Sequence, residues 1–156
     1  RDVYKRQDYN YFSFKGMRSE GNNELHVTST HYDDQIALDL VRGSQRTVAI
    51  HGCEGNESVA YIGGSDDRLI ELITESLEDI GISVREAPHH ISGTQENNIV
   101  NMTQTQGGVQ LELTAQLRKE LFKNRKSSRK NRENKDNWDD LMYDFADAMK
   151  KAIERA

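Results

Sequence analysis

Hydrophobic and polar positions along the chain follow two patterns. Short runs of β-favouring apolar residues, typical of strands buried on both faces, are separated by stretches in which apolar residues recur every three or four positions, as on one face of a helix. The short runs predict strands at residues 47–51, 58–62, 82–84 and 108–113. The helical spacing predicts helices at residues 33–41, 66–80, 115–122 and 137–156.

The order of these elements favours an α/β fold with a mostly parallel or mixed sheet flanked by helices. Residues 58–84 form a strand–helix–strand unit, which predicts a parallel, right-handed crossover. Asp33 or Asp34 is expected to begin the first helix and Ser65 to cap the second, because such side chains accept hydrogen bonds from the free N–H groups of a first turn.

The amino-terminal part is less regular. Residues 9–14 are aromatic and predict a strand, and residues 25–29 alternate as in a second short strand or extended segment. Residues 1–7 have no initiator Met and resemble the spurious leader of an open reading frame broken at the end of a sequencing read. We therefore expect residues 1–7 to be non-native and residues 8–156 to form a single domain, the carboxy-terminal portion of a longer protein.

The composition fits one globular domain. Of 156 residues, 35% are hydrophobic and 30% are charged, which allows a real core at this length. The net charge of −5 argues against a surface devoted wholly to nucleic acid or to an anionic membrane. No apolar run approaches the roughly 18 residues of a membrane span. Cys53 is the only cysteine, which excludes an internal disulfide and a cysteine-only zinc site.

His51 follows a run of apolar and β-favouring residues and is expected to lie where that strand ends. Ligands of open α/β sheets bind beyond the carboxyl ends of the strands, so a metal-capable side chain there points to a functional site. The alternative is a buried histidine whose ring nitrogens bond to backbone groups. His26 could add a second imidazole to a site, although a histidine beside a short strand is more often structural.

Gln110 and Glu112 share one face of the predicted strand at residues 108–113, because side chains alternate along a strand. Polar side chains on a central strand need partners or a wet cleft, and a partly buried carboxylate beside a metal-bound water is a suitable general base. The alternative is an edge strand whose polar face meets solvent. Asn98 and Asn101 lie in an amide-rich segment and could orient a substrate or cap loop turns.

Residues 123–135 are rich in Lys and Arg and contain no apolar residue, so we expect a mobile loop. This loop could contact a polyanion, and a phage module that binds nucleic acid through it is the alternative to an enzyme. The acidic total and the absence of interleaved aromatic side chains, which would stack on bases, oppose nucleic acid.

Five segments, taken in order, resemble the phage poly-γ-glutamate hydrolase family, formerly a domain of unknown function described as phage-related replication proteins. They are residues 25–31, 49–52, 63–64, 98–101 and 108–112. The resemblance implies a zinc-dependent hydrolase that cuts the γ-amide bonds of poly-γ-glutamate, an extracellular capsule polymer. It also implies a fold similar to that of zinc carboxypeptidases, with the first strand or strands missing.

In that family the zinc is held by a His and a Glu from an early His-x-Gly-Gly-x-Glu-like segment and by a later His. The resemblance places His51 at the later His and Glu112 at the general base. Since this sequence has no His-x-Gly-Gly-x-Glu segment, it implies a chain with one of three zinc ligands that is inactive alone. The substrate-binding candidates are Asn98, Asn101, Gln110 and His26. Possible clamps for substrate carboxylates are Arg42, Arg46, Arg68 and Arg85.

Overall fold

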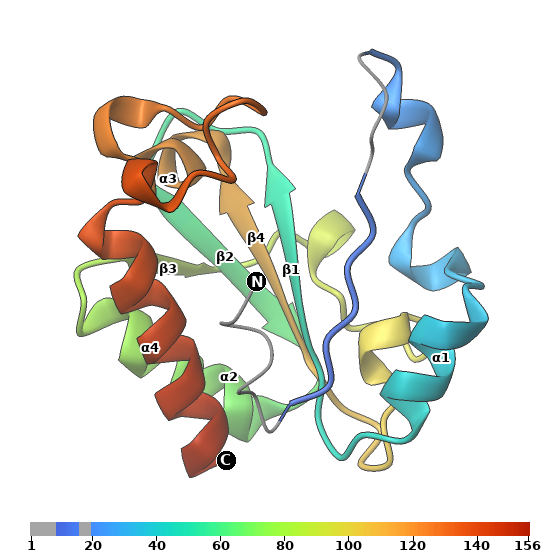
Figure 1. Ribbon diagram of the computed structural model, residues 1–156. Coiled ribbons are helices and arrows are strands. Elements are labelled where there is room, and N and C mark those ends of the chain that lie inside the picture. Colours follow the sequence, from blue (N-terminus) through green and yellow to red (C-terminus); the bar gives the residue numbers. More distant parts are fainter. Residues whose placement is uncertain (1–8, 16–19) are drawn as a thin grey trace.

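A four-stranded sheet with the strand order β1-β4-β2-β3 forms the centre of the molecule (Figure 1). The structure is a computed structural model that describes residues 9–15 and 20–156, so the predicted leader lies outside the described residues. The strands are β1 (Val48–Cys53), β2 (Val59–Gly64), β3 (Ser83–Glu86) and β4 (Val109–Thr114). The α-helices are α1 (Gln35–Arg42), α2 (Asp67–Glu78), α3 (Ala115–Glu120) and α4 (Asp140–Arg155).

The sheet is mixed. Strand β1 runs parallel to β4, and β2 runs parallel to β3, whereas β2 and β4 are antiparallel. The unit β2–α2–β3 therefore has the parallel crossover that the pattern of residues 58–84 predicts. The predicted α/β class, with a mixed sheet flanked by helices, is confirmed, and β4 is a central strand between β1 and β2.

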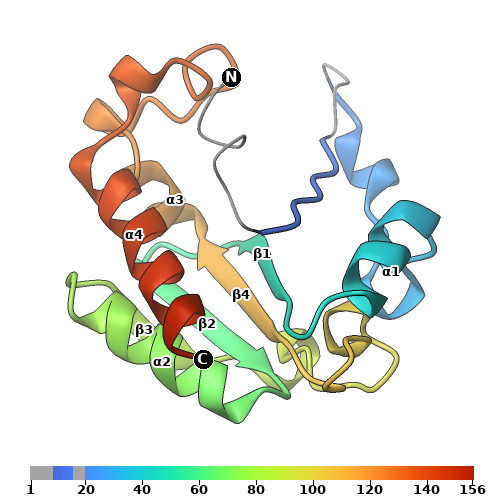
Figure 2. The same ribbon diagram turned by 60° about the horizontal axis from the view of Figure 1, so that its bottom comes forward.

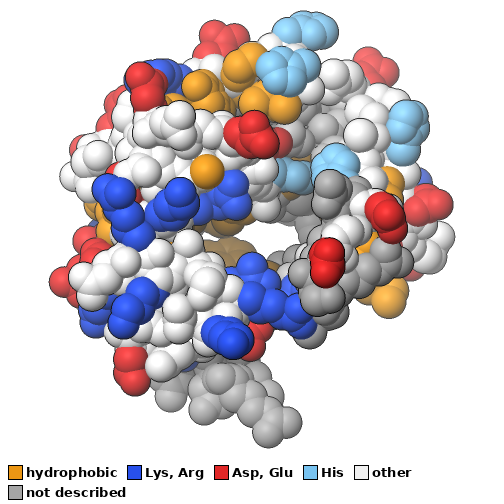
Figure 3. Space-filling model, turned by 90° about the horizontal axis from the view of Figure 1, so that it is seen from above, with side chains coloured by type: hydrophobic (Ala, Val, Ile, Leu, Met, Phe, Trp, Pro, Cys, Tyr) orange, Lys and Arg blue, Asp and Glu red, His pale blue; other side chains and the backbone are white. Residues whose placement is uncertain are grey.

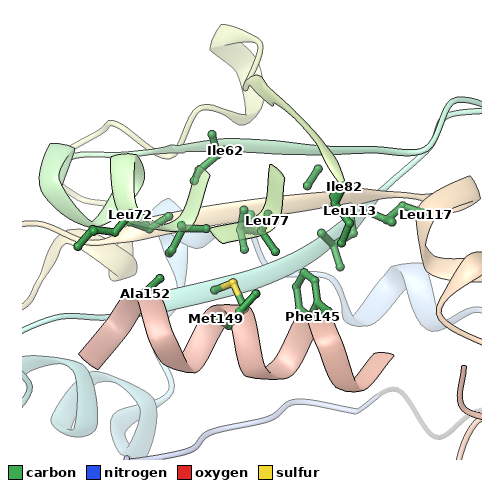
Figure 4. Packing of buried hydrophobic residues seen from close by; sticks show 14 of the residues in the cluster. Ile62, Leu72, Leu77, Ile82, Leu113, Leu117, Phe145, Met149 and Ala152 are labelled. Carbon is green, nitrogen blue, oxygen red and sulfur yellow. The ribbon is translucent and has the colours of Figure 1, made fainter. Parts of the chain in front are cut away.

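Helices α2 and α4 pack against each other over one face of the sheet (Figures 1 and 2). Figure 4 shows Phe145, Met149 and Ala152 of α4 pointing toward Leu72 and Leu77 of α2. The odd-numbered leucines of β4 belong to the same buried cluster, so the even-numbered residues of β4 face the opposite side. Within residues 9–15 and 20–156, no helix has the length and hydropathy that crossing a membrane requires.

A substitution at Leu77 tests how tightly this core is packed. The Leu77 side chain is 0% exposed, and Leu77→Ala is expected to lower the free energy of unfolding by about 2–5 kcal/mol, because the removed methyl groups lose their burial and leave a cavity. Urea denaturation measures this loss. Ile36→Ala is the matched control, since Ile36 is 67% exposed. An equal loss in both variants would contradict the packing.

Two predicted helix caps have different outcomes. Asp34 caps α1, accepting a hydrogen bond from a first-turn amide at 3.0 Å, as expected. The cap of α2 is Asp66 rather than Ser65, so that prediction was wrong by one residue. The Ser65 hydroxyl instead donates to Asn101 Oδ1 at 2.7 Å, a long-range contact that local propensity does not reveal.

The predicted strands of the amino-terminal part are wrong. Residues 9–14 lie outside the sheet, with Tyr11 and Phe14 57% and 61% exposed. Residues 25–29 form no strand, but residues 26–28 fit the alternative of an extended segment, because they have no regular secondary structure and lie between the 3-10 helices Asn22–Leu25 and Ser29–His31. An alternating or aromatic pattern favours a strand only where a partner strand is available, and these segments have none in the described structure.

Strand β1 was predicted to be buried on both faces, and this is also wrong. It lies at one edge of the sheet, and Ile50 is 54% exposed. Helices α2 and α4 cover the other strands but do not reach over β1 (Figure 2). An apolar run therefore identified a strand correctly but not its position in the sheet.

Candidate active site

His51 on β1 and Glu112 on β4 are direct neighbours across the sheet. They are Cα partners in the parallel register, and neighbouring strands lie about 4.8 Å apart. Tyr61 on β2 is the partner of Glu112 on its other side. Paired residues on neighbouring strands share a face of the sheet. The side chains of His51, Glu112 and Tyr61, each of which can carry a proton, therefore form a row on the face opposite α2 and α4.

His51 does not end its strand as expected, because β1 continues through Gly52 to Cys53. The Cys53 thiol lies 3.8 Å from the backbone oxygen of Glu112. Burial, and then the negative charge of Glu112, raise the pKa of this thiol. Cys53 therefore stays protonated and is a poor nucleophile, which agrees with a site built on His51 and Glu112.

A buried polar network holds Glu112. Asn98 Nδ2 donates to Gln110 Oε1 at 3.1 Å, and Gln110 Nε2 donates to Glu112 Oε1 at 3.2 Å. Gln110 Nε2 also bonds to the carbonyl of Ile91 at 3.2 Å. The side chains of Asn98, Gln110 and Glu112 are only 3%, 5% and 7% exposed, respectively. The alternation of Gln110 and Glu112 onto one face is confirmed, and the alternative of a solvent-facing edge strand is wrong.

Burial raises the pKa of Glu112 above the ordinary value for glutamate, and this effect outweighs the hydrogen bond from Gln110 and the positive charge of Arg118, which both lower it. A carboxyl group with a raised pKa is a stronger base once it is deprotonated. The environment of Glu112 thus suits proton transfer better than that of a surface glutamate.

The raised pKa of Glu112 makes unfolding depend on pH. The folded chain binds the Glu112 proton more tightly than the unfolded chain. The protonated carboxyl group therefore stabilises the fold fully at pH values below the pKa of Glu112 in the unfolded chain. This stabilisation is lost as the pH rises through the pKa of Glu112 in the folded chain. With Glu112→Gln, which cannot titrate, stability relative to the original chain is expected to improve as pH rises above about 4.3. Urea denaturation across a pH series, in the presence of chelator, measures this. Parallel pH curves for the two chains would contradict it.

Burial, followed by the positive charge of His26, lowers the pKa of His51. A lowered pKa favours the neutral imidazole, which is the form that binds a metal ion. His26 itself is exposed. Its part in a site with His51 stays a prediction.

Two described residues have the chemistry that a zinc site uses. His51 favours the neutral imidazole that can bind a metal ion, and Glu112 is a buried carboxyl group on the neighbouring strand. However, residues 9–15 and 20–156 contain no group of three or more His, Cys, Asp or Glu side chains that could hold a metal ion. The remainder of a ligand set is not gathered in this part of the chain.

The Gly63-Gly64 pair allows the loop that carries Asn98 to lie flat on β2. A Cβ atom at Gly63 would stand 2.0 Å from the carbonyl oxygen of Ser92, and the amide of Gly64 donates to that oxygen at 2.7 Å. A side chain at Gly63 would push this loop away from the sheet. The glycines therefore serve a close backbone approach that keeps Asn98 against Gln110.

Asn101 is buried, and its polar atoms hold the loop. Its Nδ2 donates to the carbonyls of Gly93 and Gln95, and its Oδ1 accepts from Ser65. The side chain of Asn98 is also held by hydrogen bonds within the protein, since its Oδ1 accepts from the amide of Val100. The structure gives both amides a positioning role, and their contact with substrate stays a prediction.

The other histidines and the arginine candidates have their own surroundings. His31 bonds to Thr28, and the exposed His89 and His90 lie in the 3-10 helix His89–Ile91, whose last residue accepts the bond from Gln110. Three of the four arginines proposed as carboxylate clamps already pair with acidic residues, as Arg46–Asp66, Arg68–Glu71 and Arg85–Glu57. The exposed Arg42 has no ion pair among the described residues.

Arg118 is a residue that sequence reasoning missed. Its guanidinium donates to the carbonyl of Leu113 at 3.1 Å and to that of Cys53 at 3.0 Å, which ties α3 to the ends of β4 and β1. It passes over Gly52, where a Cβ atom would stand 2.8 Å from Arg118 Cζ. The signal was Gly52 itself, because a glycine inside a strand often marks a close approach.

A family model described as poly-γ-glutamate hydrolase matches residues 1–148 of the chain. The chain belongs to this family. YoqZ, an SPbeta prophage-derived UPF0714 protein of Bacillus subtilis (strain 168), is 36% identical over an alignment of 118 residues that covers 74% of this chain and 43% of YoqZ. YmaC, a UPF0714 protein of the same organism, is 31% identical over an alignment of 159 residues, gaps included, that covers 97% of this chain and 64% of YmaC.

Two solved structures of similar proteins share the fold. A bacteriophage poly-γ-glutamate hydrolase superposes with a TM-score of 0.84 at 32% identity, over 90% of this chain and 67% of its own. The zinc-free apo form of YndL superposes with a TM-score of 0.78 at 28% identity, over 90% of this chain and 68% of its own. The chain spans 43% of the length of YoqZ and 64% of the length of YmaC.

Proposed function

We propose that this protein takes part in zinc-dependent hydrolysis of the γ-glutamyl amide bonds of poly-γ-glutamate, with His51 as a zinc ligand and Glu112 as the general base. The observation that carries the proposal is the pairing of His51 with Glu112 across neighbouring strands. Membership of the poly-γ-glutamate hydrolase family supports poly-γ-glutamate as the substrate. The existence of a zinc-free form of the similar protein YndL supports zinc as the metal.

Zinc bound at such a site supplies polarisation of the amide carbonyl and a lowered pKa for water. Glu112 accepts the proton of the attacking water and returns it to the nitrogen of the leaving amine. Gln110 bonds to Oε1 of Glu112, which leaves Oε2 for the proton transfer. Asn98 holds Gln110 in turn, so the base is oriented before the substrate arrives.

We further propose that the 156-residue chain alone hydrolyses the polymer slowly or not at all. The support is that residues 9–15 and 20–156 contain no group of three His, Cys, Asp or Glu side chains that could hold a metal ion. The polymer is an extracellular capsule component, so we infer that the active protein works outside the cell. A module that binds nucleic acid through residues 123–135 remains the second candidate, and the charge of that loop is what favours it.

A chimera tests the hydrolase. The part of YmaC outside the matched region is joined to residues 9–156, and the length of poly-γ-glutamate is followed by size-exclusion chromatography with and without a zinc chelator. We expect the chimera to shorten the polymer, the chelator to stop it, and the 156-residue chain to be inactive. Activity that survives the chelator, or full activity of the 156-residue chain, would contradict the proposal.

A further inference from the structure

Positive charge is concentrated in one segment of an acidic chain. Residues 123–135 contain seven Lys and Arg residues and one Glu, a net charge of +6, whereas the whole chain carries −5. The remaining residues therefore carry −11. Such segregation creates a local positive potential that the net charge hides and that attracts anionic partners.

The backbone of this segment is shaped by its own hydrogen bonds. It begins with a 3-10 helix, Lys123–Arg125, and is closed by a bridge between Phe122 and Trp138. The Trp138 indole donates to the carbonyl of Arg132 at 2.8 Å, and Asn137 Nδ2 donates to the carbonyl of Asn131 at 3.0 Å. These contacts hold the loop as a defined surface.

Five basic side chains of the loop remain available among the described residues. Several of them are exposed and form none of the ion pairs found among the described residues, namely Lys123, Arg125, Lys126, Lys130 and Arg132. Cations that are solvated and have no ion pair in the described part of the chain can bind a charged partner without first breaking such a pair. The loop is therefore suited to an external anion.

The loop lies at the end of the sheet that carries the candidate active site. Helix α3 starts directly after β4, and the loop follows α3 (Figure 1). Arg118, on α3, is fixed by carbonyls at the ends of β1 and β4. Seen from above this end, Lys and Arg side chains border a hollow in the surface (Figure 3). The loop and Arg118 are thus at the same end of the sheet as the carboxyl ends of β1 and β4.

We propose that the basic loop, residues 123–135, together with Arg118, binds the polyanionic chain of poly-γ-glutamate and guides it to the His51–Glu112 site. The proposal rests on the proposed function for its choice of polymer. Every γ-linked glutamate keeps a free α-carboxylate, so the polymer presents a regular row of the anions that Arg and Lys side chains bind. Nucleic acid fits less well, because Trp138 is already engaged by Lys135 and Tyr143 and is not free to stack on bases.

Binding can be measured apart from hydrolysis. Trp138 is the only tryptophan of the chain and adjoins the loop, so its fluorescence reports polymer binding to the 156-residue chain. Poly-γ-glutamate of one defined length is titrated at several salt concentrations. The variant carries Lys126→Glu and Lys130→Glu. The matched control carries Lys150→Glu and Lys151→Glu on α4, which makes the same change in charge far from the loop (Figure 1).

We expect the affinity for the polymer to fall with added salt and the loop variant to bind about tenfold or more weakly, because two attractive charges become repulsive toward the anionic polymer. The α4 control is expected to stay within about twofold of the original chain. Thermal unfolding of both variants shows whether they remain folded. Binding that persists while the YmaC chimera fails to cleave would remove the hydrolase proposal but support the docking surface.

Three results would overturn the docking surface. The first is equal affinity of the loop variant and the original chain for the polymer. The second is no measurable binding of the polymer by the original chain. The third is tighter binding of single-stranded DNA of equal charge, lost in the loop variant, which would assign the loop to nucleic acid.

Discussion

Glu112→Gln in the YmaC chimera is expected to lower kcat for poly-γ-glutamate by about 10²–10⁴-fold, the usual contribution of a positioned general base. Gln keeps the shape of the side chain and an oxygen that can accept the bond from Gln110, but it cannot take a proton from water. The loss should fall on kcat rather than KM, because the substitution leaves the binding surface unchanged.

Turnover is measured by the release of new amino groups from polymer of one defined length. The matched control is Glu78→Gln, an exposed residue at the end of α2, which is expected to leave kcat unchanged. If Glu112→Gln kept full kcat, or if both variants lost activity equally, Glu112 could not be the base.

Gly63→Ala is expected to lower both the stability of the fold and the turnover of the polymer. The new methyl group would stand 2.0 Å from the carbonyl oxygen of Ser92, and backbone cannot yield as a flexible side chain can. We expect the free energy of unfolding to fall by about 1–3 kcal/mol. Displacement of this loop would also withdraw Asn98 from Gln110 and so disturb Glu112.

Urea denaturation gives the loss of stability, and kcat of the YmaC chimera reports the disturbed base. The control is Gly43→Ala, at the end of α1, where the backbone is helical and the new atom would lie 3.2 Å from the carbonyl of Asp39. Its effect should be much smaller. Equal stability of the two variants would show that the loop does not need Gly63.

Local patterns predicted the elements that form the core and one side of the active site. The alternation of Gln110 and Glu112 within an apolar run predicted both their shared face and their need for partners. The helical spacing of α2 and α4 was equally informative, because each helix buries one continuous apolar face. These features follow from the period of the backbone and the cost of burying unpaired polar groups.

Long-range features could not be predicted in the same way. The exposure of Ile50 depends on how far α2 and α4 reach over the sheet, and the hydroxyl of Ser65 bonds to Asn101, which is 36 positions further along the chain. Arg118 reaches the strand ends only through the fold. For the same reason, the register that pairs His51 with Glu112 is visible only in the structure.

The central claim is that His51 is a zinc ligand in the same site as Glu112. The most direct measurement is the zinc content of the purified YmaC chimera, alone and with His51→Ala or Glu112→Gln. We predict about one zinc per chain in the chimera, little zinc with His51→Ala, and undiminished zinc with Glu112→Gln, because the base is not a ligand. Undiminished zinc in the His51→Ala protein would contradict the account.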